Sequence, residues 1–198
     1  MMHRFISGFL LSILLFVSFP VNAGELSDDI KKVTDKLINI VTDEKLMPLD
    51  RDAERRKLIR DAVNEIFDWE AFSRRALGRH WKKRTDKEKK EFVDLFGKLL
   101  ERTYMDKTRQ YSGEKVVFLN EIIDGDYGVA ETNVITSDGK KIAVNYRAQK
   151  EKGKWRVYDI QVEGVSLVNN YRVQFNDIIT KSSYDELVRR IKEKVGSE

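Results

Sequence analysis

The sequence predicts an α+β domain in which helices come first, a four-stranded antiparallel meander follows, and helices close the chain. Three observations support this fold class. Apolar residues recur with a period near 3.6 up to about residue 110, and with a period of 2 from Gly113 to Val162. The stretches "DGD", "SDGK" and "EKGK" between the period-2 segments are typical of tight hairpin turns. After Gly164 the helical period returns, so the sheet lies between two groups of helices.

The first three helices are short or of medium length. The segments 26–44 and 53–67 each carry one apolar stripe, and Ser27 is a candidate N-cap for the first of them. A third helix is predicted over 69–77, where Asp68 is placed to cap its first turn.

The fourth helix is long and begins with a capping-box pattern. Thr85 and Glu88 have the spacing in which each side chain bonds to the backbone of the other residue. Its apolar stripe is Phe92, Leu95, Phe96, Leu99, Leu100 and Tyr104. Strands are predicted over 115–123, 127–136, 141–150 and 155–162, and the last two helices over 166–181 and 183–195.

The first 23 residues differ from the rest of the chain. His3 and Arg4 precede an apolar run over 5–19, and the stretch closes on "VNA". This is the layout of a secretory signal peptide cut after Ala23, although an uncleaved membrane anchor is the alternative. The run is short for a membrane span of about 20 residues. We therefore expect residues 1–23 to be a signal peptide and residues 24–198 to form one domain.

Composition narrows the class of protein. The chain of 198 residues has no cysteine, so an exported form must be held by its apolar core, which a domain of this size can supply. This fits a bacterial periplasmic protein better than a small disulfide-rich secreted domain. The basic pI near 9.1 is not read as a sign of nucleic-acid binding, because export argues against such a partner. The charges are also densely mixed along the helices, as on solvated helix faces.

Few residues point to catalysis. Outside the predicted signal peptide His80 is the only histidine, so the usual zinc ligand sets and a second catalytic histidine are missing. His80 and Trp81 are interpreted as packing residues at a helix end. Asp159 stands between Tyr158 and Ile160 in a predicted strand, and is more easily read as a group that orients the backbone than as a catalytic acid. We expect no enzyme activity.

One face of the predicted sheet carries small and aliphatic side chains. Three of the four predicted strands contribute to it. The strand over 127–136 carries Ala130, Thr132, Val134 and Thr136, the strand over 141–150 carries Ile142, Val144, Tyr146 and Ala148, and the strand over 155–162 carries Tyr158, Ile160 and Val162. Such a face leaves volume that either helices or a ligand must fill. Ordinary packing of helices on the sheet is the alternative interpretation.

Three motifs then suggest a family. They are "FDWEAFSRRALGRHW" at 67–81, "EFVDLFGKLLERTY" at 91–104 and "GKWRVYDIQVEGVSLVNNYRVQF" at 153–175. With the leader, the segment order and the length, they make the chain resemble the MlaC family, also described as toluene-tolerance proteins. The last motif is the most specific, and the resemblance covers essentially the whole chain after residue 23.

The resemblance implies a fold akin to the nuclear-transport-factor-2 (NTF2-like) type, with an apolar pocket for acyl chains. It implies a monomeric periplasmic carrier of phospholipid in Gram-negative bacteria, with no cofactor, no metal and no nucleic acid. It also implies two partners, an inner-membrane MCE-domain ABC transporter complex and an outer-membrane lipoprotein–porin complex. Exchange of lipid between them would maintain the lipid asymmetry of the outer membrane.

On this reading the apolar residues around "GVSLVNNYR" belong to a pocket wall. The predicted wall is Tyr104, Val134, Val144, Tyr146, Tyr158, Ile160, Val165, Leu167, Val168 and Tyr171. Arg147 and Arg172 are predicted to meet the lipid phosphate at the rim, because a guanidinium fork suits phosphate oxygens. Two alternatives remain: a binding protein for another apolar ligand, such as an isoprenoid or aromatic solvent, and an esterase that depends on Asp159.

Overall fold

The computed structural model describes residues 24–196, and the predicted signal peptide lies outside them. Four helices precede the sheet and two follow it. They are α1 (Glu25–Thr42), α2 (Asp52–Ile66), α3 (Trp69–Leu77), α4 (Asp86–Met105), α5 (Leu167–Lys181) and α6 (Tyr184–Gly196). The connections contain the 3-10 turns η1 (Glu44–Leu46), η2 (Leu49–Arg51), η3 (Gly78–Lys83) and η4 (Asp106–Gln110). The predicted α+β class is confirmed.

The sheet is antiparallel throughout, and its strands lie in chain order. They are β1 (Lys115–Asp124), β2 (Tyr127–Ile135), β3 (Lys141–Glu151), β4 (Lys154–Val162) and β5 (Val165–Ser166). The prediction of four strands was one short. The turn at Gly164, whose φ of 78° suits glycine, folds Val165 back onto Val162 and adds the two-residue β5.

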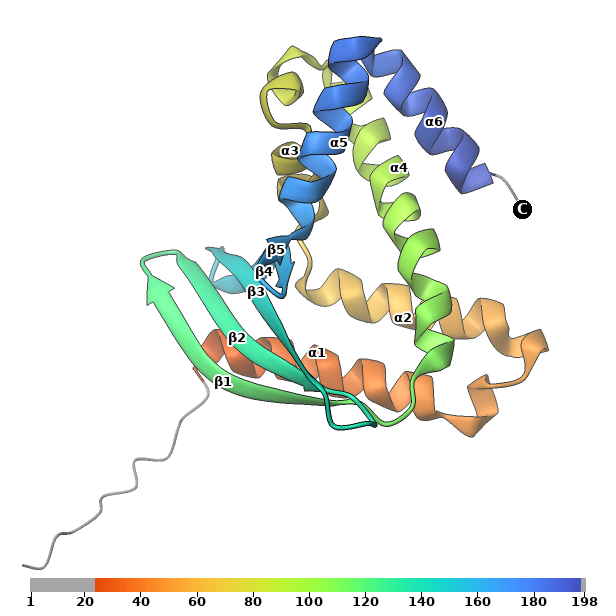
Figure 1. Ribbon diagram of the computed structural model, residues 1–198, viewed down its shortest axis with the longest axis vertical. Helices are drawn as coiled ribbons and strands as arrows, with labels where there is room; N and C mark the ends of the chain where they lie inside the picture. Colours follow the sequence, from red (N-terminus) through yellow and green to blue (C-terminus); the bar gives the residue numbers. More distant parts are fainter. Residues whose placement is uncertain (1–23, 197–198) are drawn as a thin grey trace, which may run out of the picture.

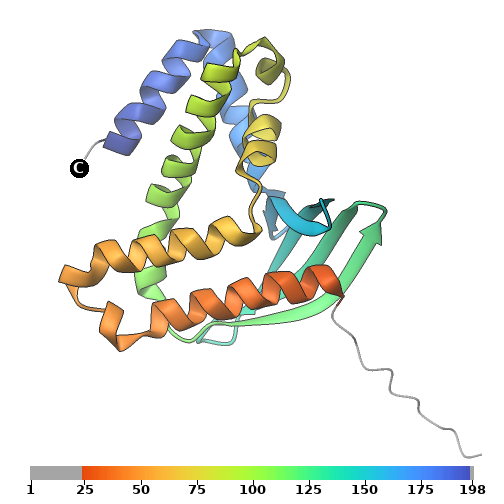
Figure 2. The same cartoon turned by 180° about the vertical axis from the view of Figure 1, so that it is seen from behind.

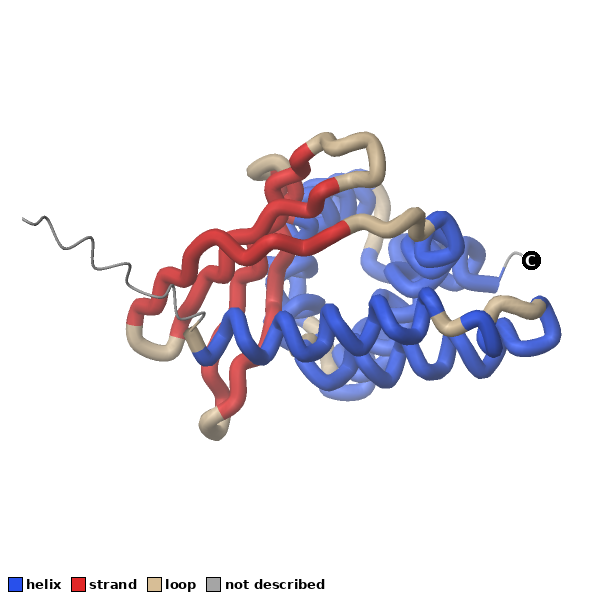
Figure 3. The backbone as a smooth tube through the Cα atoms, turned by 90° about the horizontal axis from the view of Figure 1, so that it is seen from below, coloured by secondary structure: helices blue, strands red, loops and turns tan. Residues whose placement is uncertain are grey.

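The helices form two groups around the sheet. α1 lies across one face of the sheet with α2 beside it, as Figures 1 and 2 show. α3, α5 and α6 gather with the first part of α4 at one end of the molecule, and α4 runs from there toward α1 and α2. Seen from below in Figure 3, the strands and the helices occupy adjoining sides of the molecule.

The helix group has an aromatic core. Phe96 of α4 is central to it: its ring lies 5.6 Å from that of Phe72 of α3 and 5.1 Å from that of Phe175 of α5. Phe72 and Phe96 are fully buried. This aromatic core fixes α5 against α3 and α4, and so positions the residues at the start of α5.

A second core joins α1 to the sheet. Leu26 of α1 approaches β2 at Gly128 so closely that a Cβ on that glycine would lie 2.7 Å from Leu26 Cδ2. Such a distance is too short for two carbon atoms, so a side chain at this position would force the Leu26 side chain to move. The rest of this sheet core is built from Ile30, Val33, Ile66, Ala130, Ala148, Trp155 and Val157.

The cap of α1 differs from the prediction. Ser27 was expected to be the N-cap, but the N-cap is Gly24, and Ser27 is buried in the first turn. The Glu121 side chain of β1 supplies the missing acceptor, because its Oε2 accepts a hydrogen bond from Ser27 N at 2.7 Å. The capping group therefore comes from a residue distant in the sequence. Asp68 and the Thr85–Glu88 capping box are confirmed at the starts of α3 and α4.

Replacing Glu121 by alanine is expected to lower the free energy of unfolding by about 1 kcal/mol, the usual contribution of a helix cap. The Glu121→Gln variant retains an acceptor oxygen and should lose much less. Urea denaturation followed by circular dichroism measures both changes. No loss in Glu121→Ala, or an equal loss in both variants, would contradict the capping role.

Candidate functional site

The helices cover the face of the sheet that meets α1 unevenly. Ala130 and Ala148 are fully buried under α1. Val134, Tyr146 and Ile160 on the same face are only partly buried. The register places Tyr146 opposite both Ala130 and Ile160. The helices therefore cover this apolar face incompletely.

Tyr146 lies among protein atoms on this face but is not completely covered. Burial raises the pKa of its phenol, so protein atoms surround the group closely. Its side chain nevertheless keeps part of its surface accessible to solvent. Val144, which faces Thr132 across the strands, lies on the same face and is buried.

A second group of predicted wall residues lies between α4 and α5. The Tyr171 hydroxyl lies beside Thr103 and Tyr104 of α4, and burial together with Tyr104 raises the pKa of Tyr171 to about 12. The Tyr171 ring stands edge-on to Phe96 at 4.9 Å. Tyr104 is 40% exposed. The structure thus brings together two tyrosines that are 67 positions apart in the sequence.

The start of α5 is held by Asp159. Its Oδ1 accepts a hydrogen bond from Val168 N at 3.0 Å, and its Oδ2 accepts one from Ser166 Oγ at 2.7 Å. Ser166 in turn caps α5 by accepting from Asn169 N. Both oxygens of Asp159 are therefore engaged by the chain itself. Val168 is buried in the aromatic core and Leu167 packs against it.

Tyr158 does not share the face of Tyr146 and Ile160, although strict alternation predicted that it would. A bulge in β4 pairs Asp159 with Arg147 and Val157 with Ala148, so Tyr158 is the extra residue. Its ring contacts Arg75, whose Cζ lies 3.8 Å from the ring centroid, and Tyr127 at 6.4 Å. Arg147 follows Tyr146 in β3, so it lies on the opposite face, where it approaches Tyr158.

The remaining predicted residues have separate positions. Val165 is 64% exposed in β5. Arg172 lies on the α3 side of α5, where its Nε donates to Arg75 O at 2.8 Å. The structure thus sets Arg147 and Arg172 apart from the sheet face that carries Tyr146.

One residue of the sheet face that carries Tyr146 was not among the residues predicted from the sequence. Phe118 of β1 lies opposite Thr132 and packs against the sheet core as a partly buried side chain. The alternation of Val116 and Phe118 in the predicted first strand was the available signal.

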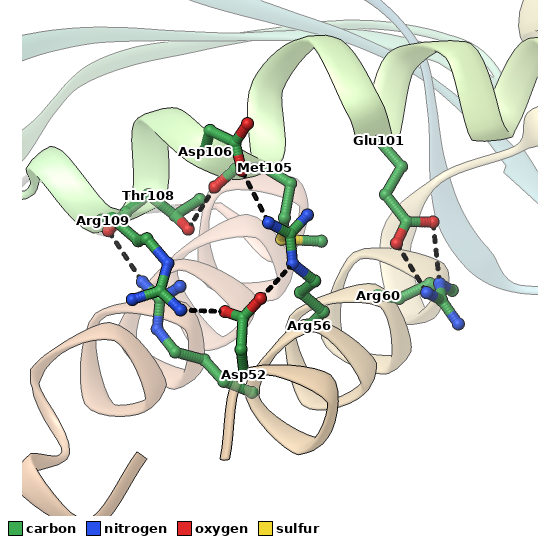
Figure 4. Close-up of polar contacts among 9 residues, drawn as sticks. Asp52, Arg56, Arg60, Glu101, Met105, Asp106, Thr108 and Arg109 are labelled. Carbon is green, nitrogen blue, oxygen red and sulfur yellow. Dashed lines mark hydrogen bonds and ion pairs between the residues drawn. The ribbon is translucent and has the colours of Figure 1, made fainter. Parts of the chain in front are cut away.

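A network of charged side chains joins α2 to η4, the turn that directly follows α4, as Figure 4 shows. Arg56 donates to Asp52 Oδ2 and to Asp106 Oδ1, each at 2.6 Å, and Arg109 donates to the other oxygen of Asp52. We call these four residues the polar clasp. Because α4 carries Tyr104 near this end, the polar clasp helps to position it.

Two further contacts extend this junction. Arg60 and Glu101 form a two-pronged ion pair at 2.5 and 2.9 Å. Arg55 is buried beside the polar clasp and donates to Thr108 O at 2.8 Å, while burial and the neighbouring Arg109 lower the pKa of its guanidinium.

The polar clasp predicts a pH-dependent contribution to stability. Hydrogen bonds from Arg56 and then Arg109 lower the pKa of Asp52, so the folded state binds a proton less readily than the unfolded state does. The contribution is complete above the unfolded pKa of about 3.9 and is lost as pH falls through the lower folded value. Asp52→Asn should lower the unfolding free energy at pH 7 by up to about 1 kcal/mol. Denaturation at pH 7 and pH 3 tests this, because a difference from wild type that does not shrink at pH 3 would exclude the effect.

No metal or membrane-spanning feature accompanies the site in the described part of the chain. Residues 24–196 contain no group of three or more His, Asp or Glu side chains placed to hold a metal ion. None of the helices among these residues is long and apolar enough to cross a membrane. His80 contacts the Asn176 Oδ1 at 3.0 Å, and Trp81 is buried in the aromatic core.

A small antiparallel sheet backed by helices, with an apolar face that they cover incompletely, defines an α+β protein in which that face could accept an apolar ligand. The MlaC protein family model matches residues 31–193. The chain belongs to the MlaC family.

Two relatives support the assignment. The first is the intermembrane phospholipid transport system binding protein MlaC of Haemophilus influenzae, 24% identical over 143 residues, covering 70% of this chain and 67% of the relative. The second is a solved structure, the phospholipid-binding protein from Ralstonia solanacearum in complex with a phospholipid. It superposes with a TM-score of 0.76 at 26% identity, over 87% of this chain and 97% of the other.

Proposed function

We propose that this protein is a soluble periplasmic phospholipid carrier. The observation that carries the proposal is the incompletely covered apolar face around Tyr146, in a fold shared with a protein solved in complex with a phospholipid. Tyr146 is only partly buried although helices back this face of the sheet, which is expected where a side chain borders a space that the helices leave open. Acyl chains from the cargo fill that space.

The wall of the acyl pocket is assigned to residues on two sides of this space. They are Tyr104 and Tyr171 from the helices, and Val134, Val144, Tyr146 and Ile160 from the sheet. Leu167 and Val168 pack behind the wall, against the aromatic core. Phe118 extends the sheet side of it.

The energetics require a dry pocket. Burying one methylene group contributes about 0.8 kcal/mol, so a 16-carbon chain represents roughly 10 kcal/mol that the protein must match when lipid leaves a bilayer. Uptake and release without assistance are therefore slow, which calls for partners at each membrane.

We assign these roles to an inner-membrane MCE-domain ABC transporter complex and an outer-membrane lipoprotein–porin complex. Exchange between them maintains the lipid asymmetry of the outer membrane, and cleavage of residues 1–23 releases the carrier into the periplasm.

Native mass spectrometry of protein purified from a bacterial periplasm without detergent tests the proposal. The expected result is a species with phospholipid bound at about one per chain, identified after extraction, and an N-terminus at Gly24. A different apolar ligand in the same pocket would favour the binding-protein alternative. Protein that is empty, and that stays empty after mixing with phospholipid vesicles and the partner complexes, would overturn the proposal.

A further inference from the structure

The segment from Ala71 to Thr85 is the most one-sided stretch of charge in the chain. It contains six lysine and arginine residues and no aspartate or glutamate. Within residues 24–196, Arg84 is the only one of the six that forms an ion pair, with Glu88. Many cations elsewhere are paired along their own helix, as Lys57 is with Asp61. Unpaired positive charge therefore gathers around the end of α3 and η3.

A cleft of about 430 Å³ opens in this region between η3 and α5. Its lining is Leu77, Gly78, Arg79, His80, Arg172, Val173 and Asn176, and includes no carboxylate. By contrast, a cleft between α1 and α2 is lined by lysines and aspartates together. The η3–α5 cleft thus has cationic groups without the compensating charges found elsewhere.

The two arginines of the cleft are held in place by neutral partners. Arg79 Nη2 donates to Asn176 Oδ1 at 2.9 Å, and Arg172 Nε donates to Arg75 O at 2.8 Å. Neither arginine forms an ion pair with any residue between 24 and 196. A guanidinium that is oriented but lacks an anionic partner is well suited to a carboxylate from another molecule.

The cleft is separate from the proposed acyl pocket. Tyr171 contacts Phe96 and Tyr104 of α4, whereas Arg172 points to the α3 side of the same helix. A lipid tail on the α4 side and an anion in the cleft therefore occupy different sides of α5.

The surroundings favour a protein over a bilayer as the occupant. Val173, 62% exposed, supplies an apolar contact beside the charges. The large aromatic side chains near the cleft, Trp81 and Phe175, are buried and unavailable as anchors in a membrane interface. A concave surface with oriented arginines and an apolar rim fits carboxylate side chains on a protein segment.

We propose that the η3–α5 cleft is the docking surface for an acidic segment of a membrane partner, with Arg79 and Arg172 receiving its carboxylates. This inference rests on the proposed function, which supplies the need for partners. Charge attraction steers the carrier to the partner and sets the orientation in which the lipid pocket meets it.

The test compares two charge-reversed variants of the full mature chain. The cleft variant is Arg79→Glu with Arg172→Glu, both exposed residues that line the cleft. The control is Lys115→Glu with Lys154→Glu, which are exposed at the starts of β1 and β4 and form no ion pair within the described residues. Net charge changes equally in both, so only position differs.

Binding is measured by biolayer interferometry to the transporter complex and to the lipoprotein–porin complex from the same organism, each in nanodiscs of zwitterionic lipid. The cleft variant is expected to bind at least one complex about tenfold or more weakly, mainly through slower association, and with a weaker dependence on salt. The control should stay within about twofold of wild type. Circular dichroism and lipid content establish that both variants are folded and loaded.

The outcomes separate the two proposals. A folded, lipid-loaded cleft variant that binds both complexes as tightly as wild type would overturn the docking surface alone. Flotation with phosphatidylglycerol vesicles, without either complex, is the second measurement. If the cleft variant loses binding only to these vesicles and keeps its binding to both complexes, the docking surface is likewise overturned. A wild-type protein that carries no phospholipid would contradict the proposed function, whatever the variants do.

Discussion

The Ile160→Trp variant is expected to purify with several-fold less bound phospholipid than the wild-type protein. Ile160 pairs with Tyr146 across the strands and lies on the same face of the sheet, where the helices leave the apolar surface only partly covered. An indole there would extend into the space assigned to the acyl chains. Because Ile160 is only partly buried, the variant should lose little stability, whereas the same change in a filled core usually costs about 1–3 kcal/mol.

The matched control is Gln161→Trp, which places the same side chain one position along β4 and on the other face of the sheet. Native mass spectrometry of the two variants, purified side by side, measures phospholipid per chain, and urea denaturation measures stability. Equal loading of Ile160→Trp and wild type, with an intact fold, would remove Ile160 from the wall. A large loss of stability with normal loading would show instead that the position is ordinary core.

Local features of the fold were predictable because the groups that make them are close in sequence. The Asp68 cap and the Thr85–Glu88 box each depend on residues within three positions of one another, and both are confirmed. The cap of α1 could not be predicted in this way, because its acceptor, Glu121, is 94 positions from Ser27. Their contact depends on how β1 lies against the helix. β5 escaped prediction because two residues carry no periodicity.

The site was predictable only in part, for a similar reason. The alternation of β3 correctly groups Val144 with Tyr146, since a regular strand preserves its period. In β4 the bulge at Tyr158 breaks that period, and nothing in "WRVYDIQV" itself marks the position of the extra residue. The proximity of Tyr104 and Tyr171 depends on the aromatic core, which sets the distance between α4 and α5.

Asp159→Ala is expected to lower the free energy of unfolding by about 3 kcal/mol. The side chain is only 3% exposed, and both of its oxygens accept hydrogen bonds, from Ser166 Oγ and Val168 N. Removing the carboxylate leaves buried donors without an acceptor, which usually costs about 1–3 kcal/mol for each unsatisfied group. Ser166→Ala removes one of these bonds and the cap of α5, and should cost about 1 kcal/mol.

Variants of Asp159 also distinguish the hypothesis of a phospholipid carrier from the alternative of an esterase. If Asp159 holds the start of α5, Asp159→Asn keeps one acceptor oxygen and should fall between wild type and Asp159→Ala in stability, with faster hydrogen exchange confined to the first turns of α5. Because α5 carries Tyr171, lipid retention should decrease in the same order. Turnover of small esters by the wild-type protein that Asp159→Asn abolishes, with exchange in α5 unchanged, would instead identify Asp159 as a catalytic residue and contradict its structural role.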